Sequence, residues 1–168
     1  DLIIEGWINF VEKDYEMAEE LFLEVLEIDS SLISYYSEAL LGLGWSNIYH
    51  AKELSGTDSS TFSERMQLRE SAKERLLTAY DEMESYSGEE EVSYNLLPDL
   101  YAALSYVNSS MALYDEYYEE SSDELVNSAL AFSDSVLSYN PDYSFLYDST
   151  NINSNSIHLL RAQLFLEQ

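Results

Sequence analysis

The stretch DYEMAEELFLEVLEID, from Asp14 to Asp29, decides the fold class of this chain. Its apolar residues recur at helical spacing, and glutamates occupy positions between them. The apolar set is Tyr15, Ala18, Phe22, Val25 and Leu26, and the acidic set is Glu16, Glu19, Glu20, Glu24 and Glu27. One face of a helix therefore faces a core and the other faces solvent, with Asp14 as the expected N-cap.

The same kind of periodicity predicts helices along the rest of the chain. The expected helices cover residues 2–11, 14–29, 32–54, 61–87, 98–118, 121–139 and 157–167. Two prolines and five glycines are few helix breakers for 168 residues, so long helices are expected. This length suits one solid core, and we predict a single all-α domain over residues 1–168.

Particular residues mark the expected helix ends and close contacts. Gly56 is expected to close the third helix as a left-handed cap. Thr61 and Glu64 are expected to open the fourth helix as a capping box. Gly42 and Gly44 each cost about 1 kcal/mol of helix propensity relative to alanine. We therefore expect another helix to approach closely at these two glycines.

The chain is strongly acidic, with 33 acidic and 7 basic residues and a net charge of -26. Because like charges repel, nucleic acids and anionic membrane surfaces are not expected as partners. No apolar run approaches the length that crosses a bilayer, so direct membrane insertion is not expected either. Cysteine is absent, which excludes disulfides, thiolate nucleophiles and thiolate metal sites.

The residue patterns of catalysis and metal binding are incomplete. His50 and His158 lie far apart in the sequence, and Glu53 after His50 does not complete a zinc motif. No serine lies in a nucleophile elbow, and no glycine-rich loop could hold a phosphate. The polar segment 148–156 lacks the spacing of an EF-hand, so we expect an Asx-rich turn there. We predict no enzymatic activity, no cofactor, and no catalytic, cofactor-binding or metal-binding residue.

An interval of twelve residues recurs in the chain. Gly6, Ala18 and the turn at Ser30 follow one another at this interval, and Ala129 precedes Pro141 by the same interval. The segment SEALLGLGW (37–45) is also similar to PDLYAALSY (98–106). These features resemble the tetratricopeptide-repeat (TPR) family. The resemblance implies a TPR-like solenoid of helical hairpins with about seven helices, lengthened second and third hairpins, and an unpaired C-terminal helix.

The resemblance also implies a function and a location. It indicates a protein-interaction scaffold without catalysis. The fragments GW at 6–7 and GLGW at 42–45 resemble those of exported bacterial TPR proteins. We therefore expect an exported protein that is extracellular, at the cell surface or in the periplasm. A chain that begins at Asp1 rather than methionine fits the removal of a signal peptide.

The first and last helices are apolar around most of their circumference, which one neighbouring helix cannot cover. We expect copies of the chain to self-associate head to tail through these helices, with an extracellular fibre as one form of the assembly. The partner is then the chain itself, as a homo-oligomer or fibre. The expected contact residues are Leu2, Ile3, Ile4, Trp7, Ile8, Val11, Ile157, Leu159, Leu160, Leu164, Phe165 and Leu166.

Other arrangements stay open from the sequence. A monomeric TPR adaptor would bind a peptide or another protein in a concave groove. The candidate groove residues are the adjacent tyrosines Tyr35, Tyr36, Tyr117 and Tyr118. A further repeat would cover the last helix, or both end helices would fold inward. A hydrolase or metal protein is a third class, and it would need polar residues that converge in a pocket.

Overall fold

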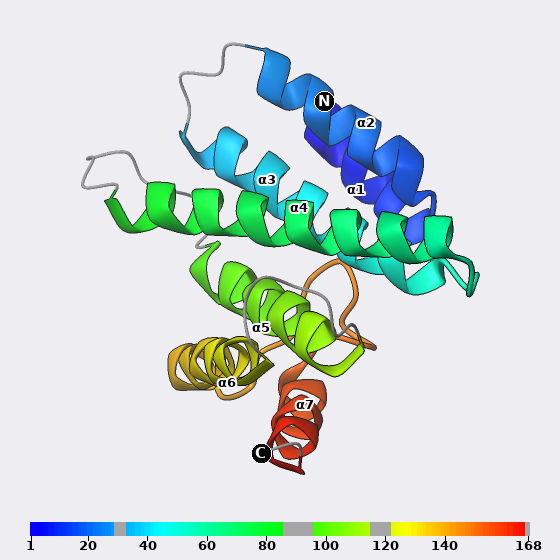
Figure 1. Ribbon diagram of the computed structural model, residues 1–168. Helices are drawn as coiled ribbons and strands as arrows, with labels where there is room; N and C mark the ends of the chain where they lie inside the picture. Colours follow the sequence, from blue (N-terminus) through cyan, green and yellow to red (C-terminus); the bar gives the residue numbers. More distant parts are fainter. Residues whose placement is uncertain (29–32, 86–95, 115–121, 167–168) are drawn as a thin grey trace.

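The computed structural model describes residues 1–28, 33–85, 96–114 and 122–166 (Figure 1). These residues form α1 (Leu2–Glu12), α2 (Tyr15–Glu27), α3 (Ile33–Glu53), α4 (Ser59–Ser85), α5 (Leu97–Tyr114), α6 (Ser122–Tyr139) and α7 (Ser154–Leu166). Within the described ranges there is no β-strand, and one isolated bridge pairs Ser144 with Asn153. The all-α prediction is therefore confirmed.

Consecutive helices lie against each other in pairs (Figure 1). α1 packs against α2, α3 against α4, and α5 against α6, while α2–α3 and α4–α5 contacts join one pair to the next. α1 also touches α3, and α3 touches α5, so the first helices of the three pairs are neighbours. α7 packs against both α5 and α6. The expectation of an unpaired last helix is therefore wrong for the inward face of α7.

Short polar caps define where the first two helices begin. The Asp1 carboxylate accepts a hydrogen bond from the Ile3 backbone N–H, and the Asp14 carboxylate accepts one from Met17 N–H, both at 3.2 Å. Between the helices, Lys13 adopts a left-handed backbone conformation with φ 67°. These contacts confirm Asp14 as the N-cap of α2.

The expected ends of α3 and α4 need correction. Asp58, not Thr61, caps α4, because its carboxylate accepts hydrogen bonds from the backbone N–H groups of Ser60 and Thr61 at 3.1 and 3.0 Å. Gly56 does not form a left-handed cap, since none of the described glycines has a positive φ. The Arg65 guanidinium instead donates to the carbonyl oxygens at the end of α3 and at Gly56, at 2.9 and 2.7 Å.

The Phe22 side chain of α2 lies where α1 and α3 approach α2 closely. It is fully buried, and a Cβ atom added at Gly6 of α1 or Gly42 of α3 would lie within 2.7 or 2.4 Å of its ring. A Cβ atom at Gly44 would meet Leu76 of α4 at 2.5 Å. The expectation that another helix approaches closely at Gly42 and Gly44 is therefore confirmed.

The connection between α6 and α7 is a folded segment, which we call the aromatic loop (residues 140–153). Its chain doubles back through hydrogen bonds from Phe145 N–H to Ile152 O and from Ser154 N–H to Tyr143 O. The side chains of Tyr143, Phe145 and Ile152 are buried in the main core. Ile152 is thus a buried apolar residue within the polar segment 148–156. α7 begins at Ser154 rather than at the expected residue 157.

The aromatic loop joins parts of the chain that are distant in sequence. Phe145 lies against Trp7 of α1 and Trp45 of α3, with ring centroids 5.8 and 5.1 Å apart. Tyr147 stacks on Trp7 at 4.0 Å, and the Tyr143 hydroxyl donates to Asp99 of α5 at 2.7 Å. The loop thus packs on the first helix of each of the three pairs.

A substitution at Gly42 tests the close approach around Phe22. Overpacking a core costs about 1–3 kcal/mol, whereas replacing a helical glycine by alanine gains about 1 kcal/mol. Since the added Cβ would lie within 2.6 Å of three atoms of the Phe22 ring, we expect Gly42→Ala to lower the midpoint of thermal unfolding. In a Phe22→Leu background the same substitution should cost less. An equal cost in both backgrounds would contradict the packing argument.

The loop offers a matched pair of substitutions at neighbouring positions. Phe145 is fully buried, and Leu146 is 70% exposed. We expect Phe145→Ala to lower the free energy of unfolding by about 3–5 kcal/mol, and Leu146→Ala to change it by no more than about 0.5 kcal/mol. Denaturant unfolding followed by helical circular dichroism measures both. Similar values for the two variants would show that the loop does not anchor the core.

Candidate functional site

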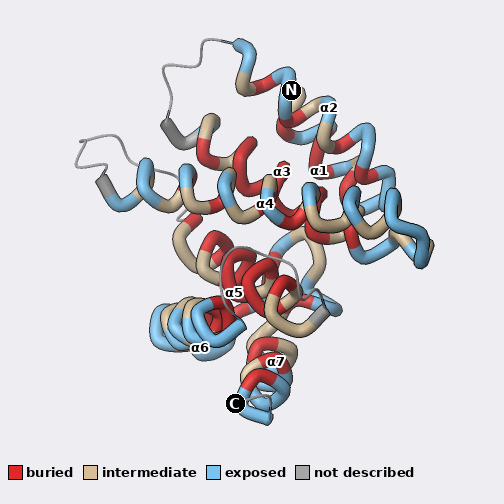
Figure 2. The backbone as a smooth tube through the Cα atoms, in the orientation of Figure 1, coloured by how far each residue is buried: buried red, intermediate tan, exposed pale blue. Residues whose placement is uncertain are grey.

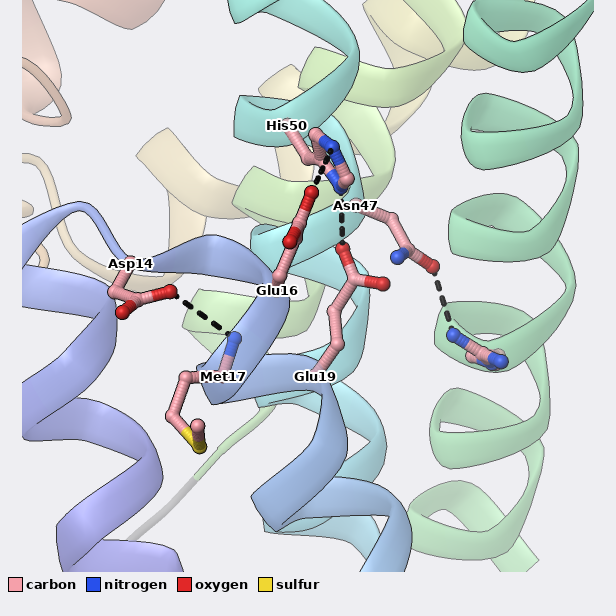
Figure 3. Close-up of polar contacts among 7 residues, drawn as sticks. Asp14, Glu16, Met17, Glu19, Asn47 and His50 are labelled. Atoms are coloured by element: carbon pink, nitrogen blue, oxygen red, sulfur yellow. Dashed lines mark hydrogen bonds and ion pairs between the residues drawn. The ribbon is translucent and has the colours of Figure 1, made fainter.

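A polar cleft lies where α2, α3 and α4 meet. The Nδ1 atom of His50 is 3.1 Å from Glu19 Oε1, and its Nε2 atom is 3.8 Å from Glu16 Oε1 (Figure 3). On the same side of α3, Asn47 Oδ1 accepts a hydrogen bond from the Arg75 guanidinium at 2.8 Å. The cleft has a volume of about 370 Å³ and also contains Glu64 and Ser71.

The geometry of this cleft favours helix pairing rather than metal binding. The two ring nitrogens of His50 face different carboxylates, so the three groups do not converge on one point. Among the described residues, no group of three histidine, aspartate or glutamate side chains could hold a metal ion. The hydrogen bonds of His50 and Asn47 therefore serve to connect α3 to α2 and to α4.

Asp148 is the first residue of the polar segment 148–156. Its Oδ1 atom accepts hydrogen bonds from the backbone and side-chain amides of Asn151, at 3.3 and 2.9 Å. Its Oδ2 atom accepts one from the Tyr49 hydroxyl at 2.5 Å. Because donors already surround both oxygens, this segment is an Asx turn, as predicted. Burial, followed by the bond to Asp148, raises the pKa of Tyr49.

The first candidate interaction surface is the outward side of α1, which we call the α1 row (Ile4, Ile8 and Val11). These side chains are 57%, 50% and 56% exposed, although each is large and apolar. They border a groove of about 270 Å³ whose other walls are Trp7, Glu12 and Tyr147. The aromatic loop therefore supplies one wall of a groove on the first helix.

The second candidate surface is the outward side of α7, which we call the α7 stripe (Leu159, Ala162, Phe165 and Leu166). All four residues are exposed, and Leu166 is 85% exposed. The opposite side of α7 is also apolar but buried. Ile157 belongs to the main core, and Leu160 and Leu164 pack with Val126 and Ala129 of α6. α7 is thus apolar on two opposite faces. Figure 2 shows buried and exposed residues alternating along this helix, in red and pale blue.

The predicted contact residues divide between these outward surfaces and the core. Six are exposed: Ile4, Ile8, Val11, Leu159, Phe165 and Leu166. Five are buried and are not available to another copy: Ile3, Trp7, Ile157, Leu160 and Leu164. Leu2 is partly buried against the main core. The prediction is wrong for the buried residues because counting apolar residues along a helix does not separate its inner face from its outer one.

The candidate groove tyrosines are not brought together in the described structure. Tyr35 is 44% exposed, and Tyr36 is partly buried against the main core. Tyr117 and Tyr118 lie outside the described residues.

Sequence reasoning missed the wall that Tyr147 forms beside the α1 row. The alternation of Tyr143, Phe145 and Tyr147 in an otherwise polar segment was the available signal.

No family model matches this chain, and neither the curated proteins nor the solved structures contain a match. Among the described helices, none is both long and apolar enough to cross a membrane. The features of the described structure that bear on function are the two apolar surfaces and the charge of the molecule.

Buried tyrosines near the α1 row give the fold a dependence on alkaline pH. Burial, together with the negative charges of Glu53 and Asp148, raises the pKa of Tyr15 to about 12. Tyrosine in an unfolded chain ionises near pH 10. The folded state therefore binds this proton more tightly, and the stability that results is complete below pH 10 and lost as the pH rises toward 12.

A conservative substitution measures this contribution. We expect Tyr15→Phe to lose less stability than the wild type between pH 10 and pH 12. The more exposed Tyr35 provides the control variant, Tyr35→Phe. Denaturant midpoints measured across this pH range give the comparison. A Tyr15→Phe curve parallel to that of the wild type would assign the alkaline loss to other groups.

Proposed function

We propose that this protein is a non-enzymatic interaction scaffold, a TPR-like solenoid whose copies associate head to tail through α1 and α7. The observation that carries the proposal is the pair of exposed apolar surfaces on the first and last helices. Large apolar patches exposed on a soluble domain mark interaction sites more often than isolated apolar residues do. The pairing of consecutive helices supports the solenoid part of the proposal.

The aromatic loop favours self-association over the adaptor alternative. A peptide groove across the first helices of the three pairs would use the side that contacts Phe145, Tyr147 and Tyr143. Phe145 and Tyr143 are buried there, so the chain itself fills much of that side. The exposed apolar side chains on the outward sides of α1 and α7 remain open to a partner.

The energetics of such a contact balance apolar burial against charge. Burial of a large apolar side chain contributes roughly 1.5–3 kcal/mol, and the six exposed contact residues are all of this kind. Each copy carries a net charge of -26, so copies repel one another at low salt. Because the two surfaces differ, their contact is heterologous and gives an open fibre unless the geometry closes a ring.

The proposed location follows from composition and from the family resemblance. Export to the periplasm, the cell surface or the extracellular space suits an acidic, lysine-poor chain with the GW and GLGW fragments. An extracellular fibre is the form of assembly that best combines this location with a heterologous contact. The chain would then contribute structure rather than chemistry.

Solution mass across a concentration and salt series tests the proposal. We expect the mass of the wild type to rise with concentration, and to rise further as salt reduces the repulsion between copies within about 10 Å at 0.1 M. The double variant Leu159→Asp, Leu166→Asp should remain monomeric. A matched control, Met17→Asp with Leu23→Asp, changes two exposed apolar residues of α2 and should behave like the wild type. A folded wild type that stays monomeric throughout would refute the proposal.

A further inference from the structure

α7 differs in charge from every other described helix. Its sequence, SNSIHLLRAQLFL, contains no aspartate or glutamate, whereas each of the other six helices contains at least one. Its only side chains with basic groups are His158 and Arg161, and Arg161 pairs with Asp134 of α6. The chain as a whole has 33 acidic residues and repels other acidic molecules. Such a molecule can approach the α7 stripe without repulsion from a carboxylate of α7 itself.

α1 has the complementary character. Glu5 and Glu12 are its charged residues, and it contains no lysine or arginine. Its C-terminal turn also carries the negative end of the helix dipole and contains no basic residue, although the C-cap is Lys13. The positive end of the α7 dipole lies at Ser154. An antiparallel pairing of α1 with α7 therefore brings opposite helix ends together and places the acidic helix beside the helix that lacks acid.

The spacing of the apolar residues also matches in this orientation. From Val11 back to Ile8 and Ile4, the intervals are three and then four residues. From Leu159 through Ala162 to Leu166, the intervals are again three and then four. In an antiparallel pair these residues therefore meet as Val11 with Leu159, Ile8 with Ala162, and Ile4 with Leu166. The small Ala162 at the centre allows the two helix axes to approach closely.

The remaining residue of the α7 stripe lies on the side of the groove. At 3.6 residues per turn, Phe165 flanks the row formed by Leu159, Ala162 and Leu166. Trp7 flanks the α1 row in the same rotational sense. When two helices face each other antiparallel, flanking positions of the same sense fall on the same side, whereas in a parallel pair they fall on opposite sides. The antiparallel pair thus directs Phe165 toward the groove beside Trp7 and Tyr147.

We infer that α7 of one copy docks antiparallel on α1 of the next, with Ala162 against Ile8 and Phe165 in the groove between α1 and Tyr147. This inference rests on the proposed head-to-tail association and specifies which residues form the contact between copies. The groove volume of about 270 Å³ accommodates a side chain such as that of phenylalanine. The aromatic loop would then serve both the core of its own chain and the binding surface for its neighbour.

Two half-blocked variants test which surfaces meet. The first carries Ile4→Asp and Ile8→Asp and keeps an intact α7, and the second carries Leu159→Asp and Leu166→Asp and keeps an intact α1. All four positions are exposed, so the fold should tolerate these changes. Each variant alone should be monomeric, and an equimolar mixture should form a dimer of twice the monomer mass that does not grow further. A dimer formed by either variant alone would overturn the inference.

Disulfide trapping tests the direction of the helices, because the chain contains no cysteine of its own. Ile8→Cys is placed in the variant with an intact α1, and Ala162→Cys in the variant with an intact α7. Mild oxidation of the mixture should cross-link these chains. The control combines Ile4→Cys with Leu159→Cys, which face each other only in a parallel pair. In the antiparallel pair they are separated by about 10 Å along the helix axes and should not cross-link.

A substitution at Phe165 tests whether this side chain occupies the groove. Phe165→Ala in the variant with an intact α7 should raise the Kd of the mixed dimer by about tenfold or more. If the wild type associates but the Ile8–Ala162 pair does not cross-link, the proposed function stands and this contact is wrong. If the wild type does not associate at any concentration or salt, the proposed function itself fails.

Discussion

The indole ring of Trp7 is the contact on which the arrangement of the helices depends. It touches Phe22 of α2 and Phe145 of the aromatic loop, and it stacks on Tyr147 at 4.0 Å. Its N–H donates a hydrogen bond to Glu38 of α3 at 3.2 Å. One side chain of the first helix therefore contacts α2, α3 and the aromatic loop. Burial raises the pKa of the Glu38 carboxyl group. Through Tyr147, the same ring also forms the groove beside the α1 row.

Local patterns in the sequence predicted the helices because each one carries its own periodic signal. Asp14 and the apolar residues of α2 are an example, and Gly42 correctly indicated a close neighbour. The aromatic loop was not predicted, because its stability comes from the rings of Trp7 and Trp45, which are distant from it in the sequence. A segment rich in serine and asparagine has the composition of a linker, and only the distant partners of Phe145 and Ile152 place it in the core.

The interaction surfaces were predicted at the level of helices but not of faces. Leu159 and Leu160 are adjacent and chemically identical, yet one is 63% exposed and the other is buried. Their environments differ because α7 rests against α5 and α6, a contact that the amino-acid pattern of α7 does not encode by itself. The absence of acidic residues from α7 was visible in the sequence, but it became informative only when the outward face of that helix was known.

The closure of the aromatic loop onto the first helix also has a consequence for how this chain folds. In stacked helical pairs each unit contacts only its neighbours, so order can spread from one unit to the next. Here the core around Trp7 is incomplete until Phe145 reaches it, and contacts of such long sequence separation slow folding. During synthesis at about 5–20 residues per second, the ring that completes the core around Trp7 would follow it by roughly 7–28 seconds. Completion of the core around Trp7 therefore depends on a segment that is synthesised long after the first hairpin.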